Sequence, residues 1–143
     1  MSIRDPDPMT TQEARARLAA ARVARLATTR PRIVPIVFAL HGDTLVHAVD
    51  HKPKRTRALA RLDDVRADPR VSVLADEYDD TDWSRLWWVR ADGTARILHP
   101  GGADEQAAID LLVARYAPYR ERRPEGPVLA IDVTRWSGWS AAE

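Results

Sequence analysis

Apolar and polar residues alternate along this chain in short blocks, and the period of the alternation changes from block to block. Ala14, Leu18 and Ala21 recur at helical spacing. They follow Thr10 and Glu13, which stand three residues apart as in a capping box and mark the start of a helix. Similar spacing recurs twice further along. The pattern therefore predicts three helices, over about residues 11–22, 53–67 and 103–116.

Strands are indicated where β-branched and aromatic residues run together between turn residues. Ile33–Leu40 is almost wholly apolar, as expected for a strand covered on both faces, and Gly93 inside another run predicts a bulge or a tight bend. Strands are expected over residues 23–28, 33–40, 44–49, 71–75, 86–98 and 128–139, with loops at 76–82 and 118–127.

The helices are too few, and too irregularly placed, for a doubly wound α/β sheet. The order of elements favours a mainly β fold, a small antiparallel barrel of about six strands with three peripheral helices. Residues 1–9 are rich in proline and charge and are expected to form a flexible arm. Residues 10–143 are then a single domain.

Composition narrows the classes of function. A chain of 143 residues is long enough for one domain with its own core. The formal net charge of +1 gives no overall field for nucleic acid or a membrane surface, so neither partner is expected. The absence of cysteine excludes disulfides, thiolate metal sites and cysteine nucleophiles. A polar N-terminus and the lack of an apolar run of about 20 residues favour a cytoplasmic protein.

Tryptophan is the residue type that this composition leaves unexplained. The chain has five tryptophans and one phenylalanine. Four of the tryptophans stand in two pairs, Trp87-Trp88 and Trp136/Trp139, and the fifth is Trp83. So much indole surface is expected to pack in the core, against a planar ligand or against a second subunit.

Several segments in this order form a familiar pattern: residues 23–28, Val34-Pro35-Ile36-Val37-Phe38, His51-Lys52-Pro53-Lys54-Arg55, Asp68-Pro69-Arg70-Val71-Ser72 and Leu86-Trp87-Trp88-Val89-Arg90-Ala91-Asp92-Gly93-Thr94-Ala95. Over about residues 10–140 the chain resembles the pyridoxamine 5′-phosphate oxidase-like (PPOX-class) split β-barrels, and within them the subgroup described as F420-dependent enzymes of actinobacteria. The resemblance implies a homodimer with a cofactor of FMN or F420 type across the barrel at the subunit interface. It also implies that Pro35 and Val37 contact this cofactor.

A basic turn precedes the second expected helix. Lys52, Lys54, Arg55 and Arg57 surround a helix end that already carries partial positive charge. The conflict disappears if an anion binds among them. A solvated basic loop is the alternative, but the resemblance favours a cofactor phosphate held by Lys52, Lys54 and then Arg55. His51, beside them, is a further candidate for anion binding.

A second candidate lies on the long strand over 86–98. Alternation places Trp88 and Arg90 on one face, and Trp87 and Val89 on the other. An indole beside a guanidinium suits a planar, polyanionic ligand. The alternative is a tryptophan anchoring a dimer and an arginine in a surface salt bridge. By position, the resemblance implies that this strand serves the partner subunit's cofactor.

The other candidates carry less weight. Trp136 and Trp139 either close one end of the barrel or form a lid over the cofactor ring. His47 and His51 fall on a strand and its following turn with no third ligand at a recognisable spacing, so no metal site is expected. The acidic segment 76–82 lacks the residue order of an EF-hand and is interpreted as a solvated loop.

The leading hypothesis is an F420-dependent reductase that transfers a hydride between the deazaflavin and a small conjugated acceptor. No catalytic residue is indicated, because in such sites the cofactor carries the chemistry. An FMN-binding oxidoreductase of the pyridoxamine phosphate oxidase type is the closest alternative. A non-catalytic cofactor carrier is favoured somewhat by the short connection Thr29–Arg32, where relatives have a longer hairpin. A dimeric interaction module without a ligand is the weakest alternative.

Overall fold

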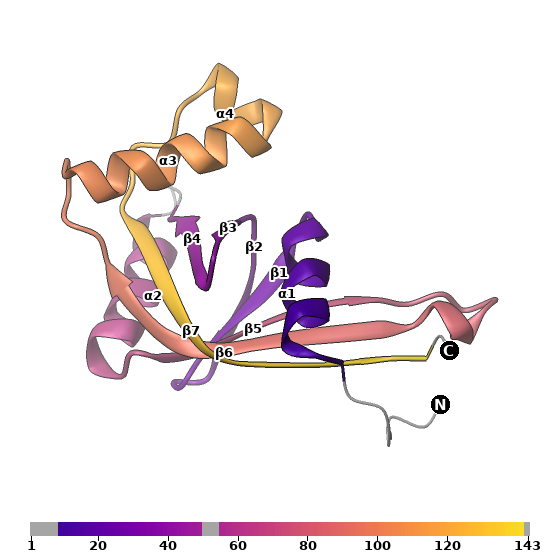
Figure 1. Cartoon of the computed structure of the whole chain (residues 1–143). Coiled ribbons are helices and arrows are strands. Elements are labelled where there is room, and N and C mark those ends of the chain that lie inside the picture. The colour runs from indigo at the N-terminus through magenta and orange to yellow at the C-terminus, as the bar shows by residue number, and fades with distance from the viewer. Residues whose placement is uncertain (1–8, 50–54, 142–143) are drawn as a thin grey trace.

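The computed structural model describes residues 9–49 and 55–141 (Figure 1). The helices are α1 Thr11–Ala20, α2 Arg55–Ala67, α3 Ala103–Arg115 and α4 Ala117–Glu121, with a 3₁₀ turn, η1, at Trp83–Arg85. The strands are β1 Ala24–Thr28, β2 Arg32–Ile36, β3 Ala39–His41, β4 Thr44–Ala48, β5 Arg70–Glu77, β6 Trp87–Ile97 and β7 Val128–Ser140. Thr10 caps α1 with the predicted capping box to Glu13.

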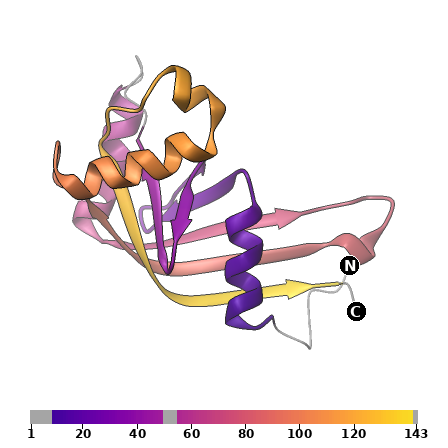
Figure 2. The ribbon, with the colours of Figure 1, turned by 45° about the horizontal axis from the view of Figure 1, so that its top comes forward.

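All seven strands form one antiparallel sheet in the order β2-β1-β5-β6-β7-β4-β3. The two edge strands, β2 and β3, are nevertheless consecutive in the chain and are separated only by Val37 and Phe38. Because two residues span only a short distance, the sheet must curl until its edges lie close together. The result is a barrel with a seam between β2 and β3 (Figures 1 and 2).

A tyrosine at the end of α3 closes this seam. The Tyr116 hydroxyl accepts a hydrogen bond from the Phe38 backbone N–H at 3.1 Å. The same oxygen lies 2.8 Å from the Phe38 carbonyl and 3.0 Å from the Arg22 carbonyl, to one of which it donates its proton. Arg115 adds a hydrogen bond to the Phe38 carbonyl at 3.2 Å. These side chains satisfy backbone groups that a continuous ladder of strands would otherwise pair.

The core consists of two clusters on opposite sides of the sheet. The inner cluster fills the barrel and takes Leu18 from α1 and Leu62 from α2. The second cluster lies outside the barrel, where Ile109 and Leu112 of α3 pack over β3, β4 and the first half of β7. Both faces of the sheet are therefore covered at the α3 end, and only the inner face elsewhere (Figure 2).

Gly93 marks a bulge in the longest ladder. The register between β6 and β7 shifts between Asp92 and Gly93. A Cβ at position 93 would overlap the backbone carbonyl of Asp132. Only glycine allows the two backbones to approach this closely, so the bulge predicted from the sequence is confirmed and has a steric cause.

The mainly β split barrel is confirmed, with seven strands where about six were expected and four α-helices where three were expected. The single strand over 33–40 was wrong. The run divides into β2 and β3 at opposite edges, and Ile33 of β2 is 70% exposed rather than covered. The run is apolar because the residues at its bend face the two cores: Ile36 and Phe38 point into the barrel, and Val37 packs under α3.

Two predicted loops were also partly wrong. The segment 118–127 begins with α4, whose first turn accommodates Pro118 because a proline there leaves no hydrogen bond unmade. In the acidic segment 76–82, Asp76 and Glu77 complete β5 and pair with Trp88 and Trp87. The predicted arm over residues 1–9 falls outside the described residues except for Met9, whose backbone N–H bonds the Gly138 carbonyl at 3.2 Å.

Candidate functional site

The outer side of β2, β1, β5, β6 and the second half of β7 forms one surface, here called the open face. Its members alternate with core residues along each strand. The helices pack elsewhere, α1 and α2 on the inner side and α3 over β3 and β4. The open face carries Ile33, Pro35, Arg25, Ala27, Leu74, Ser72, Asp76, Trp88, Arg90, Asp92, Ser137 and Trp139.

Trp88 and Arg90 both lie on the open face, as the alternation predicts, while Trp87 and Val89 point inward. Trp88 sits between Asp76 of β5 and Trp139 of β7. Arg90 forms an ion pair with Asp92, with 3.1 Å between Nε and Oδ1, and this is the surface salt bridge expected as its alternative role. The Arg90 side chain is still 42% exposed, so it is also accessible to a ligand.

Pro35 lies on the same face and in the same cross-strand row as Arg90. The row runs Pro35, Arg25, Leu74, Arg90, Ser137 across five strands. Strands are spaced about 4.8 Å apart, which puts Pro35 about 14 Å from Arg90. Val37 is not on this face, because its side chain packs against the cluster under α3. The cofactor contacts predicted for these residues stay predictions.

Most of the predicted basic turn falls outside the described residues. His51, Lys52 and Lys54 fall outside the described residues. Arg55 is the first residue of α2, and its side chain is likewise not described. Their role in phosphate binding therefore stays a prediction.

The structure pairs a half-buried arginine of α2 with a buried histidine of β4, a contact that the sequence pattern did not indicate. His47 is 4% exposed, and its Nδ1 lies 3.0 Å from the Val37 carbonyl. Arg61 of α2 reaches its Nε2 at 2.7 Å. A guanidinium can only donate, so Nε2 is the acceptor, Nδ1 carries the proton and the ring is neutral. Burial, reinforced by the charge of Arg61, lowers the pKa of His47 to about 4.

Arg61 has no carboxylate partner among the described residues, and its buried Nε has no hydrogen-bond acceptor there. Burial, and secondarily the neighbouring charge of Arg32, lowers its pKa. A half-buried guanidinium whose Nε is buried without an acceptor offers a donor to an anion. The sequence did contain a signal: Arg61 stands beside Leu62 and four residues before Val65, on the apolar side of the helix.

The neighbouring carboxylate is already engaged. Asp64 is 2% exposed and accepts hydrogen bonds from Arg32 Nε at 2.7 Å and Thr28 Oγ1 at 2.8 Å. Arg30 lies 3.8 Å away on its other side. The hydrogen bond from Arg32 is the main cause that lowers the pKa of Asp64. Asp64 therefore neutralises the arginines of β2 and its preceding turn rather than Arg61.

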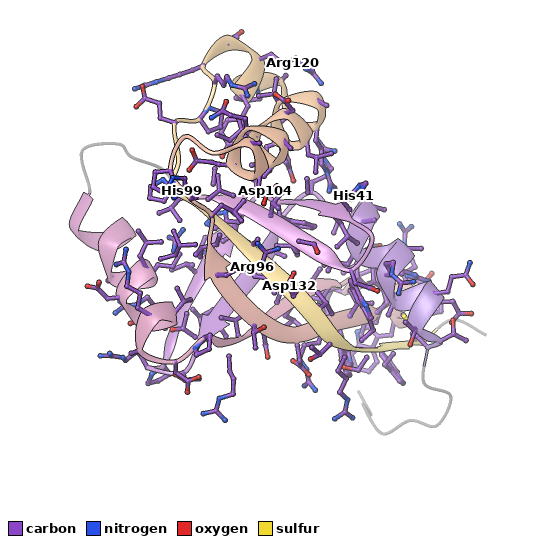
Figure 3. The ribbon with its side chains drawn as sticks, turned by 60° about the vertical axis from the view of Figure 1, so that its left-hand side comes forward. His41, Arg96, His99, Asp104, Arg120 and Asp132 are labelled. Atoms are coloured by element: carbon purple, nitrogen blue, oxygen red, sulfur yellow. The ribbon has the colours of Figure 1, made fainter. Side chains whose placement is uncertain are left out.

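A further ion pair and a hollow lie on the strands of the sheet. Arg96 of β6 and Asp132 of the neighbouring strand β7 pair at 2.8 Å, and this hydrogen bond lowers the pKa of Asp132 (Figure 3). An open hollow of about 380 Å³ lies over β1, β5 and β6. Three of the five hydroxyl side chains that line it make contacts within the chain: Ser72 donates to Asp92 at 2.6 Å, Thr28 to Asp64 and Thr134 to the Asp92 carbonyl at 3.2 Å.

The two C-terminal tryptophans have different environments. Trp136 packs against the inner core, and its Nε1 donates to Asp43 at 2.9 Å. Trp139 faces outward beside Trp88. Only Trp139 is therefore placed to contact a ligand on the open face.

Within residues 9–49 and 55–141 no group of three or more His, Asp or Glu side chains is arranged to hold a metal ion. His47 is occupied by Val37 and Arg61, and its proposed companion His51 lies outside the described part. None of the helices described is both long and apolar enough to cross a bilayer.

The sequence profile of the pyridoxamine 5′-phosphate oxidase family matches residues 10–140 of the chain. The chain therefore belongs to this family, as its resemblance indicated. No match was found among curated proteins.

Solved structures support the same fold. An FAD-binding protein from Mesorhizobium loti is 24% identical, with a TM-score of 0.69 over 92% of this chain and 95% of the other. An FAD-binding protein from Mycobacterium smegmatis is 19% identical, with a TM-score of 0.63 over 92% and 93% of the two chains. A putative 5-nitroimidazole antibiotic resistance protein from Bacteroides thetaiotaomicron is 13% identical, with a TM-score of 0.70 over 92% and 86%. At these identities the likeness concerns the fold.

Proposed function

We propose that the protein is a homodimeric oxidoreductase that binds a flavin-type cofactor between its subunits. The observation that carries the proposal is the open face, a sheet surface without helix cover on a chain of the pyridoxamine 5′-phosphate oxidase family. Two of the similar structures are of FAD-binding proteins, which supports a flavin-type ligand.

The apolar side chains of the open face favour a second copy of the chain as its cover. Ile33 is 70% exposed and Leu74 38% exposed, and both lie on the surface that also carries Pro35, Trp88 and Trp139. Exposed apolar side chains gathered on one face of a sheet mark an interaction surface in soluble proteins. A two-fold interface would bury this surface on both subunits at once.

The described residues fit the two ends of such a cofactor. Trp88 and Trp139 lie side by side on the open face and would flank a planar ring. The buried Nε of Arg61, which has no acceptor among the described residues, is a donor for an anion, and it lies a few residues along the chain from Lys52 and Lys54, which are predicted to hold phosphate. When bound, the cofactor supplies the hydride chemistry, and the residues of the chain orient it and exclude water.

Two kinds of cofactor fit these residues. The several cations around residues 51–57 suit the phosphate and polyglutamate tail of F420, which makes an F420-dependent reductase acting on a small conjugated acceptor our first choice. FMN or FAD needs fewer cations and is the alternative that the similar structures favour. In a third possibility the protein binds the cofactor as a carrier. The connection between β1 and β2 is only residues 29–31, which supports a reduced set of ring contacts.

Equilibrium titration of the full chain with F420, FMN and FAD tests the proposal. Lys52 and Lys54 are the only lysines in the chain, so the Lys52→Ala/Lys54→Ala variant leaves twenty arginines unchanged. A double variant of two exposed arginines away from the open face, Arg66→Ala/Arg122→Ala, is the matched control for lost charge. Binding that the lysine variant loses and the control keeps supports the site, and the ligand that binds identifies the cofactor. If none of the three binds the folded protein, the cofactor proposal fails and the interaction module replaces it.

Turnover separates an enzyme from a carrier. The reduced cofactor is mixed with the protein and a panel of quinones, enones and nitro compounds, and its oxidation is followed by absorbance. Oxidation that requires both protein and acceptor supports the reductase. Binding without oxidation by any acceptor supports the carrier.

A further inference from the structure

A small hollow of about 80 Å³ opens at the far end of the β5–β6–β7 ribbon and is here called the indole hollow. It is lined by Asp76, Glu77, Tyr78, Leu86, Trp87, Trp88 and Trp139. Asp76, Trp88 and Trp139 are direct cross-strand neighbours on three adjacent strands. A carboxylate and two indoles are therefore held in one row on the same face of the sheet.

The tryptophans of this chain divide into two kinds. Trp87 and Trp136 face inward and are each covered by an arginine of α1, with guanidinium carbons 5.2 Å and 5.5 Å from the ring centres. Within the described residues no such cation lies over Trp88 or Trp139. The fold uses cation–π contacts on the inner side of the ribbon and leaves the two outer indoles without one.

The carboxylates of the indole hollow are only loosely paired. Asp76 lies 3.7 Å from Arg25, and Glu77 lies 3.6 Å from Arg85. Both distances exceed that of a hydrogen bond, and both arginines are at least half exposed. Exposed pairs of this kind contribute little, so a better-placed cation can displace them. The hollow thus combines negative charge, aromatic surface and a volume of two to three water molecules.

We propose that the indole hollow binds the cationic headgroup of a small organic molecule, a substituted ammonium or a guanidinium. Trp88 and Trp139 supply the aromatic surface and Asp76 the counter-charge. The volume admits a headgroup rather than a whole molecule, so the remainder of the ligand lies along the open face. Because the proposed function assigns Trp88 and Trp139 to the cofactor ring, the headgroup and the ring are alternative ligands of this indole pair, and the proposal concerns the cofactor-free chain.

Choline is a suitable probe, and 3,3-dimethyl-1-butanol, its uncharged analogue of the same shape, is the control ligand. The full chain has five tryptophans and therefore five indole N–H signals in a ¹H–¹⁵N correlation spectrum, each assigned by single substitution. We expect choline to shift the signals of Trp88 and Trp139 and to leave that of Trp136 in place. We expect the alcohol to shift none of them at the same concentration.

Two variants test the assignment of roles. Trp139→Leu is expected to weaken choline binding about threefold to tenfold, from the loss of one cation–π contact. Asp76→Asn is expected to weaken it about twofold to fivefold, and Asp63→Asn, an exposed carboxylate on α2, is expected to leave it unchanged. Equal shifts with choline and the alcohol, or no shift with either, would overturn the cation site. Because no flavin is present in this titration, such a failure leaves the cofactor proposal standing, and a failure of cofactor binding leaves the cation site standing.

Discussion

Removal of the Tyr116 hydroxyl tests the account of the seam. In the Tyr116→Phe variant the aromatic ring stays and the oxygen that accepts from the Phe38 N–H is lost. Phe38 is fully buried, so water cannot replace that partner. The Phe38 carbonyl keeps its hydrogen bond from Arg115 at 3.2 Å, and Arg22 is exposed and can bond to water. The substitution therefore strands one buried donor.

A buried, unsatisfied backbone donor costs about 1–3 kcal/mol, and we expect a loss of about 2 kcal/mol in the free energy of unfolding. Urea denaturation followed by fluorescence measures this loss directly. With a slope of about 2 kcal/mol per molar urea, the midpoint is expected to fall by about 1 M.

Tyr78→Phe is the matched control. It removes the same hydroxyl from an exposed tyrosine whose bond to Asp80 is 2.9 Å long. Its effect is expected to stay within about 0.5 kcal/mol. If the two variants lose the same stability, the seam does not depend on the Tyr116 hydroxyl and our explanation of its closure is refuted.

Three further predictions concern the bulge, the buried histidine and the open face. Gly93→Ala is expected to destabilise the fold by several kcal/mol in urea denaturation, because its Cβ would overlap the Asp132 carbonyl, whereas Thr94→Ala on the next, exposed position is expected to change little. His47 has a pKa lowered to about 4 in the folded protein against about 6.5 when unfolded, so the unfolded chain binds the extra proton between these values. Stability should therefore fall as the pH drops from 6.5 toward 4, by up to about 1.4 kcal/mol per pH unit; between pH 6.5 and about 5, above the range in which the carboxylates protonate, this slope should vanish in His47→Gln and persist in His41→Gln, and an unchanged slope there in His47→Gln would contradict the assignment. Ile33→Glu is expected to convert a dimer to a monomer in sedimentation velocity, and Ala107→Glu, on the exposed side of α3, is not; a dimer that survives Ile33→Glu would place the interface elsewhere.

The sequence predicted local structure well wherever one physical signal dominated. The capping box at Thr10 and Glu13 located the start of α1. Gly93 located the bulge because a close backbone approach leaves no alternative residue. The alternation in β6 correctly separated Trp88 and Arg90 from their neighbours, since a strand has no other way to orient consecutive side chains.

The errors arose where tertiary position overrides local pattern. Ile33–Leu40 is uniformly apolar, yet its parts face the barrel interior, the α3 cluster and the open face. Apolar character alone cannot distinguish a side chain buried in the core from one that stays exposed on the surface of the chain. Arg61 was missed for the opposite reason, because a charged residue in an amphipathic helix is ordinarily solvated, and its contact with His47 brings in a strand that the helical pattern does not reveal.

The position of β7 in the sheet has a consequence for how the molecule is made. β7 follows every other strand in the chain, and it alone joins the half that contains β6 to the half that contains β4. Before residues 128–140 have emerged from the ribosome, β1, β2, β5 and β6 can pair with one another, but β3 and β4 form only an isolated hairpin. Completion of the barrel during synthesis must therefore wait for this one segment, and until then the nascent chain exposes two unpaired sheet edges to chaperones and to other chains.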